Sequence, residues 1–335
     1  MPKEKKLKPI SQPLVKSIYT ADPSAHAFEG KIYIYGSHDI EAGVPADDYG
    51  SHFAMEDYRI LSMKSASDKK ATVHGVALHV KDVPWVEKQF WAPDAAYKNG
   101  TYYLYFPAKA KDGAFRIGVA TSKKPMGPFK AQPKAIKGSF SIDPCVFVDD
   151  DGEAYMYFGG IWGGQLQRWR SGKFVKKVGH PTDGEPADHE PQLCSKVARL
   201  RGDMLEFAEK PRDVVLLDQK GKLILAGDHD RRFFEASWMH KYNGTYYFSY
   251  STGDTHKICY ATADNPYGPF RYRGVILNPV IGWTNHHSVV EFKGKWYLFY
   301  HDRSLSGGVT HLRSIKVAPL KHKKDGTIET ITAYK

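Results

Sequence analysis

Three carboxylic acids, one tryptophan and one histidine stand at matching distances before glycine turns in this chain. Glu235 and Asp143 each precede a turn glycine by nine residues, and Trp91 precedes its own by the same interval. Asp22 and His286 precede theirs by eight residues. Because residues that share a position in a structural repeat occupy equivalent places, we expect these five side chains to face one site.

The chemistry of such a set points to sugars. Two carboxyl groups flanking a glycosidic bond, one protonated and one ionised, are the machinery of glycoside hydrolysis. A carboxyl group in apolar surroundings has a raised pKa and donates a proton at neutral pH. Glu235, flanked by Phe234 and Trp238, is the best candidate for the acid. A third carboxylate could hold that acid in place and raise its pKa, and Trp91 offers a flat face to a sugar ring.

Taken singly, each of these residues has a simpler interpretation. Asp22 and Asp143 both precede a proline, which is typical of a turn. Trp91 alone indicates a core residue and His286 alone a buried, hydrogen-bonded histidine. A lone Glu in an apolar strand is normally paired or at an edge. The functional interpretation therefore depends on the shared register and not on any one residue.

The elements that carry these residues form a repeat. Five times, a glycine turn leads into a strongly aromatic segment, and another extended segment precedes the turn. Glu, Asn, Asp or Lys stands before each glycine, as in tight hairpins. The five turn segments are Gly30-Lys-Ile-Tyr-Ile-Tyr, Gly100-Thr-Tyr-Tyr-Leu-Tyr, Gly152-Glu-Ala-Tyr-Met-Tyr, Gly244-Thr-Tyr-Tyr-Phe-Ser and Gly294-Lys-Trp-Tyr-Leu-Phe.

The intervals between turns leave room for two further strands in each unit. Candidates are Phe115-Arg-Ile-Gly-Val-Ala-Thr and Lys257-Ile-Cys-Tyr-Ala-Thr, and each is followed by a Pro-x-Gly-Pro-Phe turn. Five units of four strands predict an all-β fold, a five-bladed β-propeller. The first strand of each blade lines the central channel, so the active site is expected at the mouth of that channel.

The rest of the chain is interpreted as part of the same unit. Residues 1–335 are expected to form a single catalytic domain, with a flexible N-terminal tail over residues 1–12. Residues 40–60 are rich in acids, Gly and Pro and are expected to form an irregular loop. Residues 185–215 are less β-like, and we expect a short helix there, near the bottom of the fourth blade.

The composition excludes several classes of protein. The formal net charge is +11, but no clustered basic motif accompanies it, so no nucleic-acid partner is expected. Three scattered cysteines give neither a disulfide framework nor a metal-type spacing. No signal-like apolar segment opens the chain and no apolar run is long enough for a membrane span. We therefore expect a cytoplasmic enzyme with no membrane partner.

At this point the motifs resemble those of glycoside hydrolase family 43, the five-bladed propellers active on arabinose- and xylose-containing glycans. The matching stretches lie between residues 19 and 303. They are Tyr19-Thr-Ala-Asp22-Pro, Trp91-Ala-Pro-Asp94, Ser141-Ile-Asp143-Pro, Phe234-Glu235-Ala-Ser-Trp and Asn285-His286-His287-Ser288.

The resemblance implies roles for individual residues. Asp22 corresponds to the general base that activates water, Asp143 to the residue that tunes the pKa of the acid, and Glu235 to the general acid. The family inverts the anomeric centre, which leaves room for a water molecule between the base and the sugar. Trp91 and Arg313 are implied as substrate-binding residues.

The resemblance also implies a metal ion. His286 corresponds to a channel histidine that holds Ca²⁺ or another divalent ion, directly or through waters. Asn285 stands where the family often has glycine, and His287 remains an alternative ligand.

The implied function is an exo-acting β-xylosidase that releases xylose from the non-reducing ends of β-1,4-xylo-oligosaccharides. An α-L-arabinofuranosidase, or an enzyme with both activities on arabinoxylan fragments, is the alternative. A non-catalytic sugar-binding propeller would keep Trp91 but would not need three acids. The related fructosyl-transferring propellers use a retaining mechanism, and their acid motif is absent here.

Overall fold

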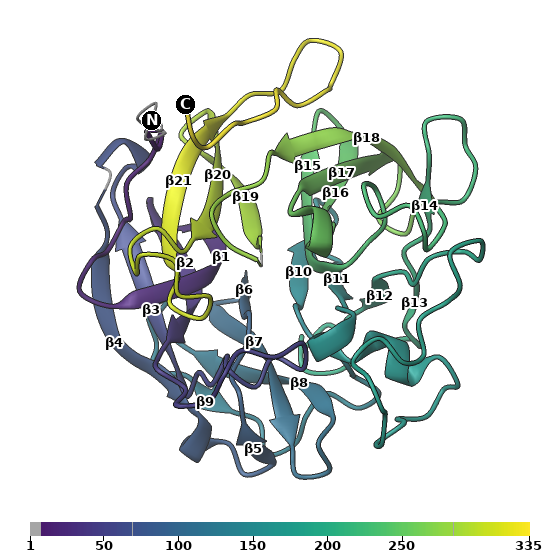
Figure 1. Cartoon of the computed structure of the whole chain (residues 1–335). Coiled ribbons are helices and arrows are strands. Elements are labelled where there is room, and N and C mark those ends of the chain that lie inside the picture. The colour runs from purple at the N-terminus through teal and green to yellow at the C-terminus, as the bar shows by residue number, and fades with distance from the viewer. Residues whose placement is uncertain (1–7, 69, 284) are drawn as a thin grey trace, which may run out of the picture.

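Five β-sheets form a ring in the computed structural model, which describes residues 8–68, 70–283 and 285–335 (Figure 1). The first sheet contains β1 (Tyr19–Phe28), β2 (Lys31–Asp39), β3 (Asp57–Met63) and β4 (Thr72–His79). The second contains β5 (Val86–Lys88), β6 (Asp94–Lys98), β7 (Thr101–Ala110), β8 (Phe115–Ser122) and β9 (Lys130–Ala131). The third contains β10 (Cys145–Val148), β11 (Ala154–Phe158), β12 (Lys196–Arg199) and β13 (Arg212–Asp213).

The last two sheets differ in size. The fourth contains β15 (Glu235–Tyr242), β16 (Thr245–Ser251), β17 (Ile258–Ala263) and β18 (Phe270–Leu277), with β14 (Leu216–Leu217) parallel to β18. The fifth contains β19 (His287–Phe292), β20 (Lys295–Asp302) and β21 (Ser314–Leu320). Short 3₁₀ turns lie at η1 (Ala66–Asp68), η2 (Val80–Asp82), η3 (Trp162–Gly164), η4 (Leu166–Trp169) and η5 (Gly253–Thr255).

The innermost strands close the ring. β1 contacts β6 and β19, β10 contacts β6 and β15, and β15 contacts β19. Each sheet is therefore one blade, and the predicted five-bladed propeller is confirmed. The expectation of four strands in every blade holds for the first and third blades, whereas the others have three or five.

The glycine turns pair the two inner strands of each blade as predicted. In four of the five turns both central residues have positive φ, as in Glu29 (50°) followed by Gly30 (71°). This is the backbone of the two-residue hairpin turn whose twist matches that of the strands. The register then follows, and Phe28 pairs with Lys31 directly across the turn.

The aromatic strands form the core between the blades. Tyr35, Tyr105 and Tyr157 lie on the second strand of their hairpins and are fully buried. Their hydroxyl groups donate to backbone oxygens of the next blade, at Pro125 (2.6 Å), Met204 (2.9 Å) and Pro266 (2.6 Å) respectively. A buried tyrosine needs such a partner, so the repeated aromatic pattern joins blade to blade.

The short helix expected within residues 185–215 is wrong. Residues 200–207 form a hairpin instead, in which Arg201 N donates to the Glu206 oxygen over 2.8 Å and Leu200 bridges Phe207. The spacing of Leu200, Met204 and Phe207 imitates the apolar stripe of a helix. However, Met204 has a φ of 66°, in the left-handed region that a right-handed helix excludes.

The described N-terminal segment, which starts at Lys8, lies with the C-terminal segment beside the fifth blade (Figure 1). The N–H groups of Lys8 and Ile10 donate to the oxygens of Lys335 (2.7 Å) and Ala333 (2.9 Å). Of the tail predicted to be flexible over residues 1–12, residues 1–7 lie outside the described residues. From Lys8 onward the structure pairs the tail with the C-terminal segment.

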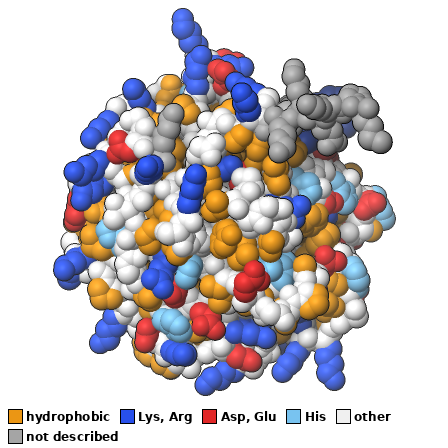
Figure 2. Space-filling model, turned by 60° about the vertical axis from the view of Figure 1, so that its left-hand side comes forward, with side chains coloured by type: hydrophobic (Ala, Val, Ile, Leu, Met, Phe, Trp, Pro, Cys, Tyr) orange, Lys and Arg blue, Asp and Glu red, His pale blue; other side chains and the backbone are white. Residues whose placement is uncertain are grey.

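The surface charge is dispersed. On the face shown in Figure 2, Lys and Arg side chains are scattered, with Asp and Glu between them. No helix within the described ranges has the length and apolarity needed to cross a bilayer.

Candidate active site

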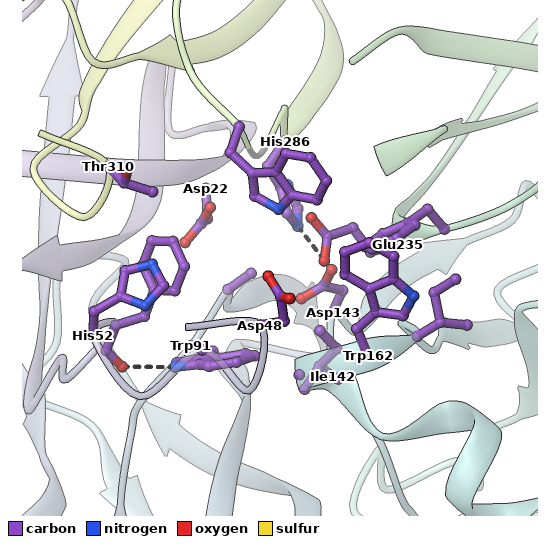
Figure 3. Close-up of a pocket in the computed structure, with 18 of the residues that line it drawn as sticks. Asp22, Asp48, His52, Trp91, Ile142, Asp143, Trp162, Glu235, His286 and Thr310 are labelled. Atoms are coloured by element: carbon purple, nitrogen blue, oxygen red, sulfur yellow. Dashed lines mark hydrogen bonds and ion pairs between the residues drawn. The ribbon is translucent and has the colours of Figure 1, made fainter. Parts of the chain in front are cut away.

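One cavity of about 260 Å³ collects every site residue that the sequence predicts. It is lined by Asp22, Trp91, Asp143, Glu235, His286 and Arg313. Five of them lie near the N-terminal ends of the innermost strands, whereas Arg313 directly precedes β21, the third strand of its blade. Figure 3 shows Asp22 on one side of the cavity and Asp143 with Glu235 on the other. The structure thus brings the five side chains of shared register, and Arg313 with them, to one cavity.

A β-bulge turns the Asp22 side chain into the cavity. The register of β1 against β2 shifts between Ala21 and Ser24, and Asp22 has a φ of 52°. Bulges are common beside active sites because they re-aim a side chain. Ser37 donates its hydroxyl to Asp22 Oδ2 over 2.7 Å, and the Asp22 N–H donates to His301 Nδ1 over 3.0 Å.

Arg313 lies between two buried acids, Asp22 and Asp39, and binds both. Its Nη1 and Nη2 atoms donate to the two Asp22 oxygens over 2.8 and 3.2 Å. Its Nε and Nη2 atoms also donate to Asp39, over 2.9 and 2.7 Å. Asp39 was not among the predicted residues, because only the folded structure brings it beside Arg313. The structure thus shows Arg313 engaged by carboxylates, and its predicted role as a substrate-binding residue stays a prediction.

These contacts decide the charge of Asp22. Burial alone would raise its pKa, but the attraction of Arg313, together with His301, His286 and the Ser37 hydroxyl, outweighs burial and lowers the pKa of Asp22 to about 2. The pKa of Asp39 is raised by burial even though it shares the same guanidinium. His301, His286 and the Ser37 hydroxyl also stabilise the Asp22 anion, whereas the charge of Asp22 itself opposes ionisation of Asp39. Asp22 is therefore the better stabilised anion and is ionised at neutral pH.

Glu235 and Asp143 occupy the opposite wall. β15 has a register shift between Glu235 and Trp238, and Ala236 has a φ of 62°. That bulge lets the Ala236 N–H donate to Asp143 Oδ2 over 2.9 Å. Gly160 makes room for the same wall, because a Cβ there would lie 2.7 Å from Ile142 and 3.2 Å from the Glu235 Cβ.

The pKa of Glu235 lies near neutrality. Burial, followed by the charge of Asp22, raises it to about 7. Burial and the neighbouring Glu235 also raise the pKa of Asp143, which the Ala236 N–H and Arg313 partly oppose. Two neighbouring buried carboxyls do not both ionise readily. This wall therefore holds a proton at neutral pH, while Asp22 across the cavity does not.

His286 lines the cavity from the position just before β19. Its Nε2 atom lies 3.6 Å from Asp143 Oδ2 and, among the described residues, has no hydrogen-bond partner. The alternative, His287, is directed elsewhere, since its Nε2 atom contacts Ser249 Oγ at 2.6 Å. No cluster of three His, Cys, Asp or Glu ligands occurs in the part of the chain that the structure describes. The donor set thus fits only an ion that takes most of its ligands from water.

Trp91 forms part of the cavity floor and is mostly buried. Its Nε1 atom donates to the Phe53 oxygen over 2.9 Å, and its ring packs on Phe115. A Cβ at Gly50 would collide with the indole at 2.5 Å, so glycine is required for this packing. Trp91 is 8% exposed, which leaves a narrow strip of the ring toward the cavity.

Two further parts of the wall were not predicted from the sequence. The loop between β2 and β3, expected to be irregular, contributes Asp48, His52 and Phe53 to the cavity. Trp162 and Trp283 also line it, and their rings stack with centroids 5.6 Å apart. These residues lie on loops outside the repeat. They have no equivalent position in the other units, so the register of the hairpins does not predict them.

The arrangement suits acid–base cleavage of a bond between two sugars. An ionised carboxylate stands on one side of the cavity and a protonated carboxyl group on the other, and aromatic rings form part of the lining. This is the pairing that glycoside hydrolysis requires.

Known proteins that are similar to this chain are glycosidases. The family model for glycosyl hydrolases family 43 matches residues 10–190 and 195–328. A xylosidase/arabinosidase of Bacteroides ovatus is 57% identical, with 95% of this chain and 96% of that protein aligned. A β-xylosidase of Xylanibacter ruminicola is 54% identical over 94% of this chain and 97% of that protein.

A solved structure gives the same result. It is a β-xylosidase/α-arabinofuranosidase from a compost microbial metagenome, in complex with xylotriose and in a calcium-free form. It superposes with a TM-score of 0.95 at 64% identity and covers 98% of this chain and 99% of its own.

Proposed function

The chain belongs to the glycosyl hydrolases of family 43, and from this membership we propose that it releases xylose from the non-reducing ends of β-1,4-xylo-oligosaccharides. The observation that carries the proposal is the difference in pKa between two acids on opposite sides of one cavity. Asp22 is ionised, whereas the pKa of Glu235 is raised to about 7. Of the relatives that share more than half of their residues with this chain, one is a β-xylosidase and another a xylosidase/arabinosidase. Arabinofuranoside cleavage is therefore the second candidate activity.

The proposed mechanism assigns one task to each carboxyl group. Asp22 takes a proton from a water molecule, whose oxygen attacks the anomeric carbon. Glu235 gives its proton to the glycosidic oxygen as the bond to the anomeric carbon breaks. Asp143, which accepts the Ala236 N–H, has the task of tuning the pKa of the acid. Because water attacks from the face opposite the leaving group, the product has the inverted configuration.

Arg313 and the aromatic residues support these steps. Arg313 keeps Asp22 ionised and fixes both of its oxygens, so it is a positioning residue in this mechanism. Trp91 and the stacked Trp162 and Trp283 provide apolar faces for the sugar rings.

In the decisive experiment, NMR follows the hydrolysis of an aryl β-xyloside. The rate of hydrolysis of an aryl α-arabinofuranoside is measured in parallel. We expect α-xylose to appear first, before mutarotation mixes the anomers, and we expect measurable turnover of both substrates. First appearance of β-xylose would contradict the inverting assignment. Turnover of the arabinofuranoside alone would replace the xylosidase proposal with the second candidate.

We also propose that a Ca²⁺ or similar divalent ion binds beside His286. The unpartnered Nε2 atom supplies one ligand, and waters supply the rest. Such an ion would add positive charge beside Asp143 and favour its ionised form.

Chelation is expected to lower both the activity and the melting temperature, and added Ca²⁺ is expected to restore them. A ligand present at a hundredfold excess over its Kd stabilises a protein by about 2.7 kcal/mol. The measurement is a calcium titration of the melting temperature for the wild type and for His286→Ala, which should not respond. An unchanged melting temperature of the wild type would leave His286 without a metal.

A further inference from the structure

A second cavity adjoins the catalytic cavity and carries a different kind of side chain. We name it the cationic side pocket and define it by Trp162, Gly163, Lys109, Arg168, Phe174 and Lys176. Its volume is about 170 Å³. Trp162 and Gly163 line both cavities, so the two cavities share a wall.

The three cations of this pocket are not neutralised by the protein. Within residues 8–68, 70–283 and 285–335, no carboxylate lies within ion-pair distance of Lys109, Arg168 or Lys176. Asp47 and Glu87 attract Lys109 from farther away. A partly buried charge is costly unless an opposite charge accompanies it, so the pocket is suited to an anion.

The backbone holds the guanidinium of Arg168 in place. Its Nε atom donates to the Val175 oxygen over 2.8 Å and its Nη2 atom to the Lys176 oxygen over 2.5 Å. The Cζ atom of Arg168 lies 4.4 Å from the centre of the Phe174 ring. These contacts fix the direction of the group without cancelling its charge. A planar guanidinium held in this way matches the geometry of a carboxylate.

Lys109 is partly buried in the wall. Its Nζ atom lies 5.0 Å from the centre of the Phe115 ring. Burial, together with Lys88 and Arg168, lowers the pKa of Lys109 to about 8. The ammonium group is thus still mostly charged at pH 7, and an anion beside it would relieve the repulsion from the two neighbouring cations.

The walls restrict the kind of anion further. Trp162 presents an aromatic ring beside the cations, and an aromatic face is suited to the apolar face of a sugar ring. A sugar ring that bears a carboxylate, which is a uronic acid, satisfies both the aromatic wall and the cations.

We propose that the cationic side pocket binds the carboxylate of a uronic acid side group carried by an oligosaccharide whose terminal sugar occupies the catalytic cavity. This inference rests on the proposed function, which places the oligosaccharide, and it adds acidic, branched oligosaccharides to the substrate class. Lys109 and Arg168 are then specificity-determining residues for the charged branch.

The test measures ligand binding without turnover, by isothermal titration calorimetry of the Glu235→Gln protein. The two ligands are xylotriose and xylotriose with a glucuronic acid side group. We expect the acidic ligand to bind about tenfold more tightly, the size of one charge-assisted hydrogen bond. Adding Lys109→Gln or Arg168→Gln should remove most of this preference, and high salt should weaken it.

Lys177→Gln is the matched control, because Lys177 is exposed on the same loop but lies outside the pocket. It should keep the preference. Equal affinity for the two ligands in the parent protein, or an equal loss with Lys177→Gln, would overturn the proposal. Free glucuronate should compete with the acidic ligand more strongly than inorganic phosphate does. Equal competition by phosphate would overturn the assignment to a carboxylate.

The two proposals fail in different ways. Loss of the proposed function would appear as absent turnover of aryl xyloside by the wild type. Loss of this inference would appear as absent preference for the acidic ligand in a protein that still binds xylotriose.

Discussion

Glu235→Gln is expected to lower kcat/KM for xylo-oligosaccharides by about 10²–10⁴-fold, the usual contribution of a general acid. Glutamine keeps the shape of the side chain but has no proton to give to the leaving oxygen. A leaving group that departs without protonation, such as dinitrophenolate, should therefore lose far less. Steady-state kinetics on xylobiose and on a dinitrophenyl β-xyloside measures the difference, and equal losses on both substrates would remove the acid role from Glu235.

The pH profile gives an independent readout of the same residue. Glu235 must be protonated to act, and its pKa is about 7, so the wild-type rate should fall as the pH rises through 7. Asp22 must be ionised, and with a pKa of about 2 it imposes no acidic limb above pH 3. The alkaline limb is thus the one assigned to Glu235, and it should disappear in Glu235→Gln with the activated substrate.

Folding controls separate this loss from damage. A carboxyl group whose pKa is raised by folding destabilises the protein when it is ionised. The Glu235→Gln protein is therefore expected to melt no lower than the wild type at pH 8. Glu329→Gln, on the exposed C-terminal segment, is the matched control for the substitution and should retain wild-type kinetics.

The repeat explains why much of the site was predictable. Asp22, Asp143 and Glu235 each belong to a segment that a glycine turn and an aromatic strand follow. Hairpin pairing is local, so the register of each segment is readable from the sequence. Once five hairpins close into a ring, equivalent positions converge. The same reasoning from hairpin register applied to His286 and Trp91, and both residues line the cavity.

The residues outside the repeat were not predictable in this way. Asp39 meets Arg313 across 274 positions of sequence, and neither residue has a local pattern that announces the other. Asp48 and Trp162 reach the cavity on irregular loops, whose path depends on packing that no periodicity records. The helix expected within residues 185–215 failed for a related reason, since apolar spacing alone does not reveal the left-handed backbone of Met204.

Arg313→Met is expected to destabilise the protein by about 3–5 kcal/mol at neutral pH, because it leaves two buried acids without their shared cation. The Arg313 side chain is 5% exposed, and Asp22 and Asp39 are 6% and 0% exposed. Water therefore does little to replace the lost charge. Without the cation, burial dominates and both carboxyls are driven toward their protonated forms. Chemical denaturation at several pH values measures this deficit, which should shrink as falling pH protonates the two acids.

The same substitution should introduce an acidic limb in the rate profile. Burial is then no longer offset by Arg313, so the pKa of Asp22 rises from about 2 into the range where activity is measurable. Since Asp22 acts in its ionised form, the rate of Arg313→Met should fall as the pH drops through the new pKa. Arg313→Lys, which restores a positive charge without the paired donors, should move that limb back toward lower pH.

A double variant tells the catalytic effect from the structural one. Adding Asp39→Asn to Arg313→Met removes one of the two unpaired charges, so part of the lost stability should return. The acidic limb should remain, because Asp22 still lacks its cation. If the second substitution restored both the stability and the wild-type pH profile, Arg313 would act only by neutralising Asp39, and its role in keeping the base ionised would have to be abandoned.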